Sequence, residues 1–269
     1  MRAPSRVASA LCVVIATTVL AGCTTNPPTE IALPPAGAAP DYQLGGAYPP
    51  PADVEIVVRD RAEPPADDVY SICYINAFQT QPAELADWPD ELLLKDDKGN
   101  TVFDPAWPDE ALLDAASDHN RDAIAEVVRP WIEGCAAAGY DAVEFDNLDT
   151  YARSDGALTF DDNLALAEQL VAIAHDAGLA AGQKNAAEDA AALRNGAGFD
   201  FAIAEECAAF DECDAYTDVY GDLVVAVEYS EAGEFRAACE DERMPPSAVL
   251  RDHELVAPGE MGYVFELCR

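Results

Sequence analysis

The stretch 140–151, YDAVEFDNLDTY, decides the fold prediction, because an apolar strand ends in it on a cluster of acids. Side chains two residues apart on a strand face the same way, so Glu144 and Asp146 point to one side of the predicted strand 141–145. Asp146 falls at the strand's end and Glu144 one layer deeper. Asp149 follows on the loop, where a local turn or a helix cap is the alternative role. Two inward acids on an apolar strand are costly to bury without a function, which favours a functional site here.

Three other apolar runs end on charged or polar pairs. VEIVV precedes Arg59-Asp60, FDFAIA precedes Glu205-Glu206, and LVVAV precedes Glu228-Tyr229. In a parallel β/α architecture the carboxyl ends of all strands gather around one mouth, so these residues are expected to converge there. Adjacent strand residues point to opposite faces, so only one of Glu205 and Glu206 is expected to enter the cleft. For Asp60 the alternative is a structural ion pair with its neighbour.

Strand-like and helix-like segments alternate along most of the chain. Predicted helices cover about 121–138, where Pro130 should cause a kink or a junction, 160–177, an alanine-rich segment ending at 193, and 235–239. Alternation of this kind predicts an α/β fold, and eight strands with charged ends favour a single-domain (β/α)8 TIM barrel over residues 41–269. The eight predicted strands are 42–44, 54–58, 69–75, 141–145, 179–183, 199–204, 223–227 and 247–250.

The N-terminal segment has the pattern of an export signal. Basic residues precede an apolar run, and Leu-Ala-Gly-Cys ends at Cys23. The pattern predicts a lipoprotein signal peptide over 1–22 with lipidation of Cys23, and a plain cleaved signal peptide is the alternative. Residues 23–40 form a Pro/Ala-rich tether that is expected to be extended. The protein is therefore expected to be exported and anchored by lipid at the extracellular face of the cell membrane, as a monomer.

Six cysteines follow the signal region, and an even number in an exported protein argues for disulfides. Six cysteines allow 15 pairings. Cys207 and Cys213 enclose a short loop, Cys239 with Cys268 could hold the C-terminus, and Cys73 with Cys135 is left by elimination. The sequence has no CxxC, and its three histidines lack metal-motif spacing, so neither a metal nor an organic cofactor is expected.

The formal net charge of −36 makes nucleic acid an implausible partner, since phosphate binding needs the opposite sign. An acidic field could attract a polycationic substrate. Alternatively, the excess acids solvate the surface of a protein from a salt-adapted or acid-rich proteome.

Other polar residues stand at predicted strand ends. Tyr74 and Asn76 suit recognition of hydroxyl groups, although Tyr74 could belong to the core. Lys184, followed by Asn185, could hold a carboxylate in its ionised form. Trp88 and Trp107 lie in a long insertion, where they could stack on sugar rings or form a small core of their own.

The segments ICYINA (72–77), YDAVEFDNLDTY (140–151), GLAAGQKNA (178–186), FDFAIAEEC (199–207) and VAVEYS (225–230) together resemble the glycoside hydrolase 114 family. Members of that family are endo-α-1,4-polygalactosaminidases with TIM-barrel folds. The resemblance covers nearly all of the chain from Tyr42 to Cys268 and implies that Asp146 and Glu205 are the catalytic pair. The family usually has Asn before that Glu and Gln after it. Here Ala204 and Glu206 stand there, which leaves open which of the two glutamates is catalytic.

Together with the export signal, the resemblance implies a secreted glycosidase that cleaves internal α-1,4 linkages of a galactosamine-rich polysaccharide. Asp146 is expected to be the nucleophile and Glu205 the acid/base, with the retaining outcome implied by the resemblance. The alternatives are a non-catalytic cell-surface polysaccharide-binding barrel, and a glycosidase for another amino sugar or a neutral α-glycan. The residues expected to bind substrate are Asp60, Tyr74, Asn76, Glu144, Asp149, Lys184, Asn185, Glu206, Glu228 and Tyr229.

Overall fold

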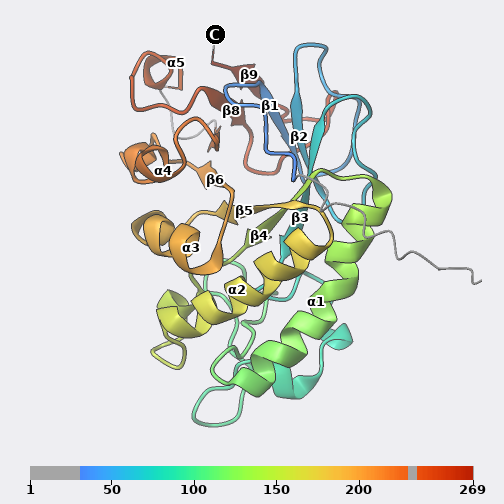
Figure 1. Ribbon diagram of the computed structural model, residues 1–269, viewed down its shortest axis with the longest axis vertical. Coiled ribbons are helices and arrows are strands. Elements are labelled where there is room, and N and C mark those ends of the chain that lie inside the picture. Colours follow the sequence, from blue (N-terminus) through green and yellow to red (C-terminus); the bar gives the residue numbers. More distant parts are fainter. Residues whose placement is uncertain (1–30, 230–234, 269) are drawn as a thin grey trace, which may run out of the picture.

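A computed structural model describes residues 31–229 and 235–268 (Figure 1). The predicted signal peptide, Cys23 and Ser230 of the motif VAVEYS lie outside these residues. The part of the predicted tether that the structure describes, residues 31–40, packs against the domain. Ala38 is buried in the barrel's core cluster, and the carbonyl of Ala39 accepts hydrogen bonds from Glu55 and Ile56. The ordered domain therefore begins before residue 41.

The sheet contains eight consecutive parallel strands and one antiparallel strand. Each strand from β1 to β8 pairs with the next in the sequence, and β9 pairs with β8. Together with the helices between the strands, this nearly closed sheet confirms the (β/α)8 prediction. The strands are β1 (Pro40–Gln43), β2 (Ile56–Asp60), β3 (Tyr70–Asn76), β4 (Ala142–Asp146), β5 (Ala180–Lys184), β6 (Phe201–Glu205), β7 (Val224–Tyr229), β8 (Ser247–Arg251) and β9 (Phe265–Leu267).

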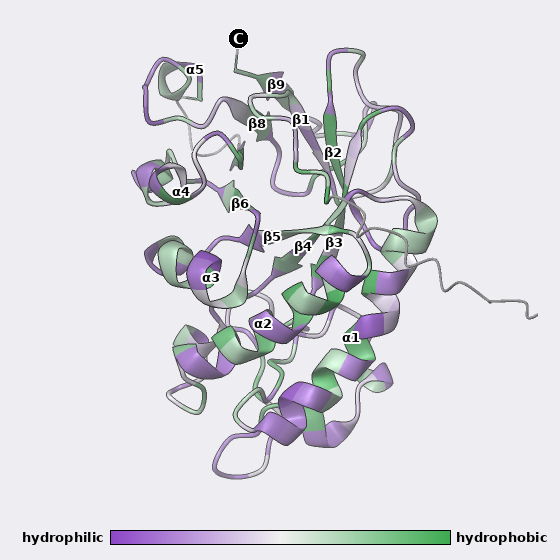
Figure 2. Cartoon of the chain, in the orientation of Figure 1, coloured by the Kyte–Doolittle hydropathy of each residue, from purple (hydrophilic) through white to green (hydrophobic). Residues whose placement is uncertain are grey.

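The helices follow one another around the outside of the sheet (Figure 1). Figure 2 shows hydrophobic and hydrophilic residues interspersed along α1 and α2, as expected of helices that pack one face against a sheet. The α-helices are α1 (Asp118–Ala138), α2 (Phe160–Asp176), α3 (Ala190–Ala197), α4 (Cys213–Tyr220) and α5 (Phe235–Ala238), and the short 3₁₀ helices are η1 (Leu85–Asp87), η2 (Asp90–Leu92), η3 (Thr150–Arg153) and η4 (Ala187–Asp189).

Local sequence signals account for the ends of the two longest helices. Ser117 caps α1 by accepting a hydrogen bond from the Asn120 amide, and Thr159 forms a capping box with Asp162 at the start of α2. Helix α1 continues through Pro130, so of the two expectations for this proline the junction was wrong and the kink stays a prediction. Helix α4 and strand β9 were missed, because their short segments lie among turn residues and a disulfide loop.

The barrel interior is filled by alternate residues of the strands. On β5 the inward position Gly182 leaves room for the ring of Phe201, which a Cβ there would meet at 2.5 Å. The opposite strand faces pack under the helices as a second, larger cluster. Apolar side chains thus occupy the lower layers of the barrel, and the polar residues come at the last inward position of each strand.

The gap between β1 and β8 is closed by a buried side chain. These two strands share no ladder within the described chain. The guanidinium of Arg251, at the end of β8, donates hydrogen bonds to the Asp41 carboxylate at 3.0 Å and to the backbone carbonyl of Tyr42. Arg251 is fully buried. Its hydrogen bonds hold β1, and with it the Tyr42 side chain, in place across the gap.

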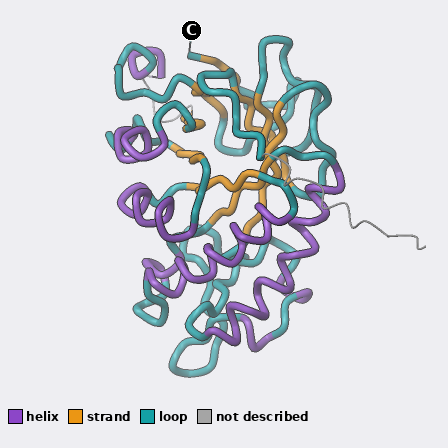
Figure 3. Tube along the Cα trace, viewed as in Figure 1, coloured by secondary structure: helices purple, strands orange, loops and turns teal. Residues whose placement is uncertain are grey.

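Three disulfides link Cys73 with Cys135, Cys207 with Cys213, and Cys239 with Cys268, which are the expected pairs. The first joins β3 to α1, the second closes the loop after β6, and the third joins the segment after α5 to the C-terminal end. The insertion between β3 and α1 is mostly loop (Figure 3) and carries irregular antiparallel bridges. Trp88 is buried there against Trp131 of α1, with ring centroids 5.6 Å apart, whereas Trp107 is exposed.

Candidate active site

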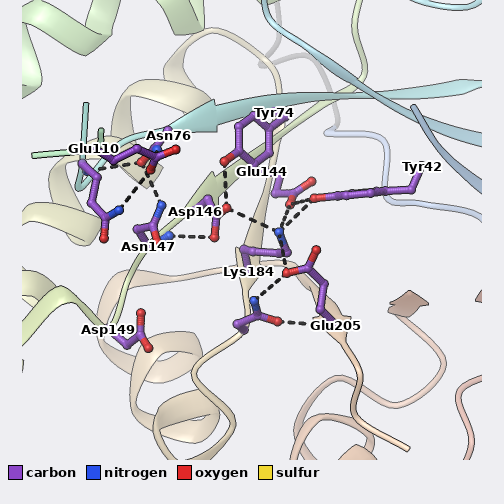
Figure 4. A network of polar contacts seen from close by, with 12 residues as sticks. Tyr42, Tyr74, Asn76, Glu110, Glu144, Asp146, Asn147, Asp149, Lys184 and Glu205 are labelled. Atoms are coloured by element: carbon purple, nitrogen blue, oxygen red, sulfur yellow. Dashed lines mark hydrogen bonds and ion pairs between the residues drawn. The ribbon is translucent and has the colours of Figure 1, made fainter. Parts of the chain in front are cut away.

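Lys184 lies at the centre of the site, among three acids from two strands, β4 and β6 (Figure 4). It is the last residue of β5 and is 2% exposed. Its Nζ lies 3.4 Å from the Asp146 carboxylate, 3.2 Å from that of Glu205 and 3.4 Å from that of Glu144. Burial opposes the charge of Lys184, but the three surrounding acids raise its pKa well above the ordinary value. Lys184 is therefore a buried ammonium shared by three carboxyl groups.

Asp146 ends β4 and is held by donors on both oxygens. The Tyr74 hydroxyl donates to Oδ2 at 2.8 Å, and the backbone amide of Asn147 donates to Oδ1 at 2.8 Å. The side chain is 16% exposed, so solvent reaches it. Lys184, which was expected to hold a carboxylate in its ionised form, contacts this one, and Tyr74 helps to fix the Asp146 carboxylate in one orientation.

Glu205 ends β6 and is held in the same manner. Asn185 donates from Nδ2 to Oε2 at 3.0 Å, and its Oδ1 accepts the Glu205 amide at 2.9 Å. Asn185 adopts a left-handed backbone conformation, which asparagine tolerates better than most residues. The Tyr229 hydroxyl donates to Oε1, and the Tyr229 ring stacks on His253 at 4.3 Å. The Glu205 side chain is 24% exposed.

Lys184 limits the separation between Asp146 and Glu205. Because its Nζ lies 3.4 Å from one carboxylate oxygen and 3.2 Å from the other, those two oxygens are at most about 6.6 Å apart. Retention and inversion differ in the separation of the whole carboxyl groups, about 5–5.5 Å against about 6.5–9.5 Å. The limit on these two oxygens places both carboxylates around one ammonium.

Glu144 lies beneath the pair and is fully buried. The Tyr42 hydroxyl donates to its Oε1 at 2.8 Å, and Oε2 is a buried oxygen without a hydrogen-bond partner. Burial raises the pKa of Glu144 to about 7, although Lys184 acts to lower it. Glu144 was expected to bind substrate. Its complete burial contradicts that role, because a ligand at the mouth cannot touch it.

Four other predicted residues lie away from this cluster. The side chain of Glu228 points outward from β7 and accepts a hydrogen bond from the Ala208 amide at 2.9 Å, so it supports the loop after β6. Glu206 follows β6 in a left-handed conformation, and its amide donates to Val227. Asp60 accepts hydrogen bonds from the Ala62 amide and from Gln81 rather than pairing with Arg59. Asp149 forms an ion pair with Arg153 at 2.7 Å.

Asn76 belongs to a second polar cluster beside Asp146, which the sequence did not predict. Asn76 is 2% exposed and donates from Nδ2 to Glu110 at 2.9 Å, and its Oδ1 accepts from Asn147 at 3.0 Å. Glu110 comes from the insertion, where acids are so frequent that no local pattern distinguishes it. Tyr42 was missed as a site residue because its strand is short and weakly patterned.

Among the described residues, Cys207, Cys213 and Glu228 are the three potential metal ligands that lie close together. Both cysteines are joined in a disulfide and thus offer no thiolate to a metal ion.

Comparisons with known proteins show the family and support the barrel fold. The family model described as glycoside-hydrolase family GH114 matches residues 21–269. The chain is similar to the crystal structure of Aspergillus fumigatus Ega3 in complex with galactosamine, with a TM-score of 0.71 and 22% identity over 89% of this chain and 98% of that one. It is also similar to the glycoside hydrolase domain of PelA from Pseudomonas aeruginosa, with a TM-score of 0.57 and 16% identity over 83% and 98% of the two chains. No curated protein matches the sequence.

Proposed function

This chain belongs to glycoside-hydrolase family GH114, and we propose that it cleaves internal α-1,4 linkages of a galactosamine-rich polysaccharide. The proposal rests on one observation. Two partly exposed carboxylates, Asp146 and Glu205, lie at the ends of barrel strands and share one buried ammonium, that of Lys184. Ega3, to which the chain is similar in fold, is described in complex with galactosamine. Protonated amino groups of such a polymer suit a strongly acidic protein.

In the proposed reaction, Asp146 attacks the anomeric carbon while Glu205 protonates the leaving glycosidic oxygen. This step forms a covalent glycosyl-enzyme. Glu205 then removes a proton from a water molecule, and the water hydrolyses the ester to restore both carboxyl groups. Tyr74 and Lys184 orient the Asp146 carboxylate through Oδ2, and Tyr229 and Asn185 orient Glu205.

A panel of polysaccharides tests the proposed activity. We expect new reducing ends and short oligomers from α-1,4-polygalactosamine, and none from β-1,4-linked chitosan, because the attacking carboxylate must stand opposite the leaving oxygen. Reducing ends and product lengths would be measured alongside titration calorimetry with oligogalactosamine. Calorimetric binding without any new ends would instead support the polysaccharide-binding alternative. Cleavage of amylose in place of polygalactosamine would support a neutral α-glycan as substrate.

We also propose that the protein is exported, anchored by lipid at Cys23 and active as a monomer. The signal-like N-terminal pattern and the three disulfides support export, since disulfides persist in oxidising compartments. Within the described part of the chain, none of the helices has the length and apolar character that crossing a membrane requires. Labelling with a radioactive fatty acid tests the anchor, and an unlabelled, released protein would contradict it.

A further inference from the structure

Glu110 is an acid near Asp146 that has no cationic partner among the described residues. The three acids at the centre share Lys184. In the neighbouring cluster, Arg153 forms ion pairs with Asp104 at 2.6 Å and with Asp149 at 2.7 Å. The Glu110 carboxylate accepts hydrogen bonds from neutral amides only. No ion pair therefore compensates a negative charge on Glu110.

One oxygen of Glu110 is held and the other is free. Oε2 accepts hydrogen bonds from Asn76 Nδ2 at 2.9 Å and from Gln79 Nε2 at 3.0 Å. Oε1 receives none from the described residues, and it is not among the unpartnered atoms that are shielded from solvent. The residue is only 9% exposed. Burial raises the pKa of Glu110 to about 7, against the effect of the two amides, as expected of a carboxylate that lacks a nearby cation.

The position of Glu110 is coupled to that of Asp146 through side chains. Asn76, which donates to Glu110, accepts a hydrogen bond from Asn147 at 3.0 Å. The backbone amide of Asn147 in turn donates to Asp146 at 2.8 Å. In the view of Figure 4, Asp146 lies between this cluster and Lys184. The insertion therefore holds Glu110 in a fixed position that this chain of hydrogen bonds links to the predicted nucleophile, whose charge acts on the pKa of Glu110.

Building on the proposed function, we propose that Glu110 recognises the protonated amino group of a galactosamine unit bound next to Asp146. An ammonium group would supply both the missing counter-charge and a donor to the free oxygen. A galactose unit would offer a neutral hydroxyl in its place. Because a hydrogen bond between ions is roughly twice as strong as a neutral one, Glu110 would make the site prefer amino sugars.

Binding to an inactive chain tests this proposal. In the Asp146→Asn background, titration calorimetry would compare an α-1,4-linked galactosamine oligomer with the matched galactose oligomer. We expect the background chain to bind the amino oligomer at least about tenfold more tightly, and Glu110→Gln to abolish most of that preference. The matched control is Asp109→Asn, which removes an exposed charge from the adjacent position and should leave the preference unchanged.

Two results would overturn the proposal, namely an absent preference in the background chain, or a preference that survives Glu110→Gln. Thermal unfolding checks that each variant is folded, and Glu110→Ala replaces Glu110→Gln if the latter is not. The reducing-end assay keeps the two proposals separate. If the wild type cleaves polygalactosamine but Glu110→Gln keeps the preference for the amino oligomer, only the role of Glu110 is contradicted. If Glu110→Gln loses that preference but the wild type cleaves nothing, only the hydrolase activity is contradicted.

Discussion

Replacing Asp146 with asparagine, or Glu205 with glutamine, is expected to lower kcat/KM for polygalactosamine by at least about 10³-fold. Each change keeps the shape of the side chain and removes its negative charge. The amide at position 146 could not form the glycosyl ester, and the amide at position 205 could not donate a proton to the leaving oxygen. Both side chains are partly exposed, and Lys184 keeps two acids in either variant, so the fold should tolerate each change.

The matched control for this prediction is Glu206→Gln, which removes the same charge one residue further along the chain. The Glu206 backbone turns away after β6, and no described contact joins its side chain to Lys184. The Glu206→Gln variant should therefore retain most of the wild-type kcat/KM. All three variants should unfold at similar temperatures. Activity lost in Glu206→Gln but kept in Glu205→Gln would mean that the catalytic acid had been assigned to the wrong glutamate.

Replacing Lys184 with methionine should reduce both stability and activity. The change leaves three carboxyl groups in contact range without their shared cation, and removing one partner of a buried ion pair costs about 3–5 kcal/mol. Lys184 also acts to lower the pKa of Glu144, so without it that pKa rises above about 7. When folding raises the pKa of an acid, that acid stabilises the folded state at pH values below the pKa it has in the unfolded chain. The stabilisation is lost as the pH rises through the pKa that the acid has in the folded protein. The stability deficit of the variant should therefore be larger near pH 8 than near pH 5.

Chemical unfolding of Lys184→Met and the wild type at these two pH values measures the deficit. The control is Lys95→Met, which removes a partly exposed lysine of the insertion that pairs with Asp90. Surface ion pairs contribute at most about 1 kcal/mol, so its deficit should be small at both pH values. A Lys184→Met deficit as small as that of the control would show that Lys184 does not neutralise the buried acids.

Much of the site could be predicted because strand alternation fixes which side chains face inward. The two-residue spacing of Glu144 and Asp146 predicted their common face and their different depths, and the structure confirms both. The choice between neighbours was harder. Glu228 and Tyr229 were both expected at the site, but only one of two adjacent residues can face the barrel, and that residue is Tyr229.

Two contacts at the site could not be predicted from the sequence, because each joins segments that are far apart along the chain. Tyr42 reaches Glu144 from 102 residues away, because Arg251 holds β1 across the gap in the barrel. Glu110 reaches Asn76 through an insertion whose antiparallel bridges show no alternating pattern in the sequence. In both cases the contact depends on how separate segments pack, and neither segment carries a local signal for it.

The configuration of the first-formed reducing ends tests most directly the claim that Asp146 is the nucleophile and Glu205 the acid/base. Proton NMR of polygalactosamine during early cleavage distinguishes the two anomers before they equilibrate. Double displacement at an α-linkage predicts that the α-anomer appears first. Initial release of the β-anomer would mean that water attacks the sugar directly, and would contradict the assignment of Asp146 as nucleophile.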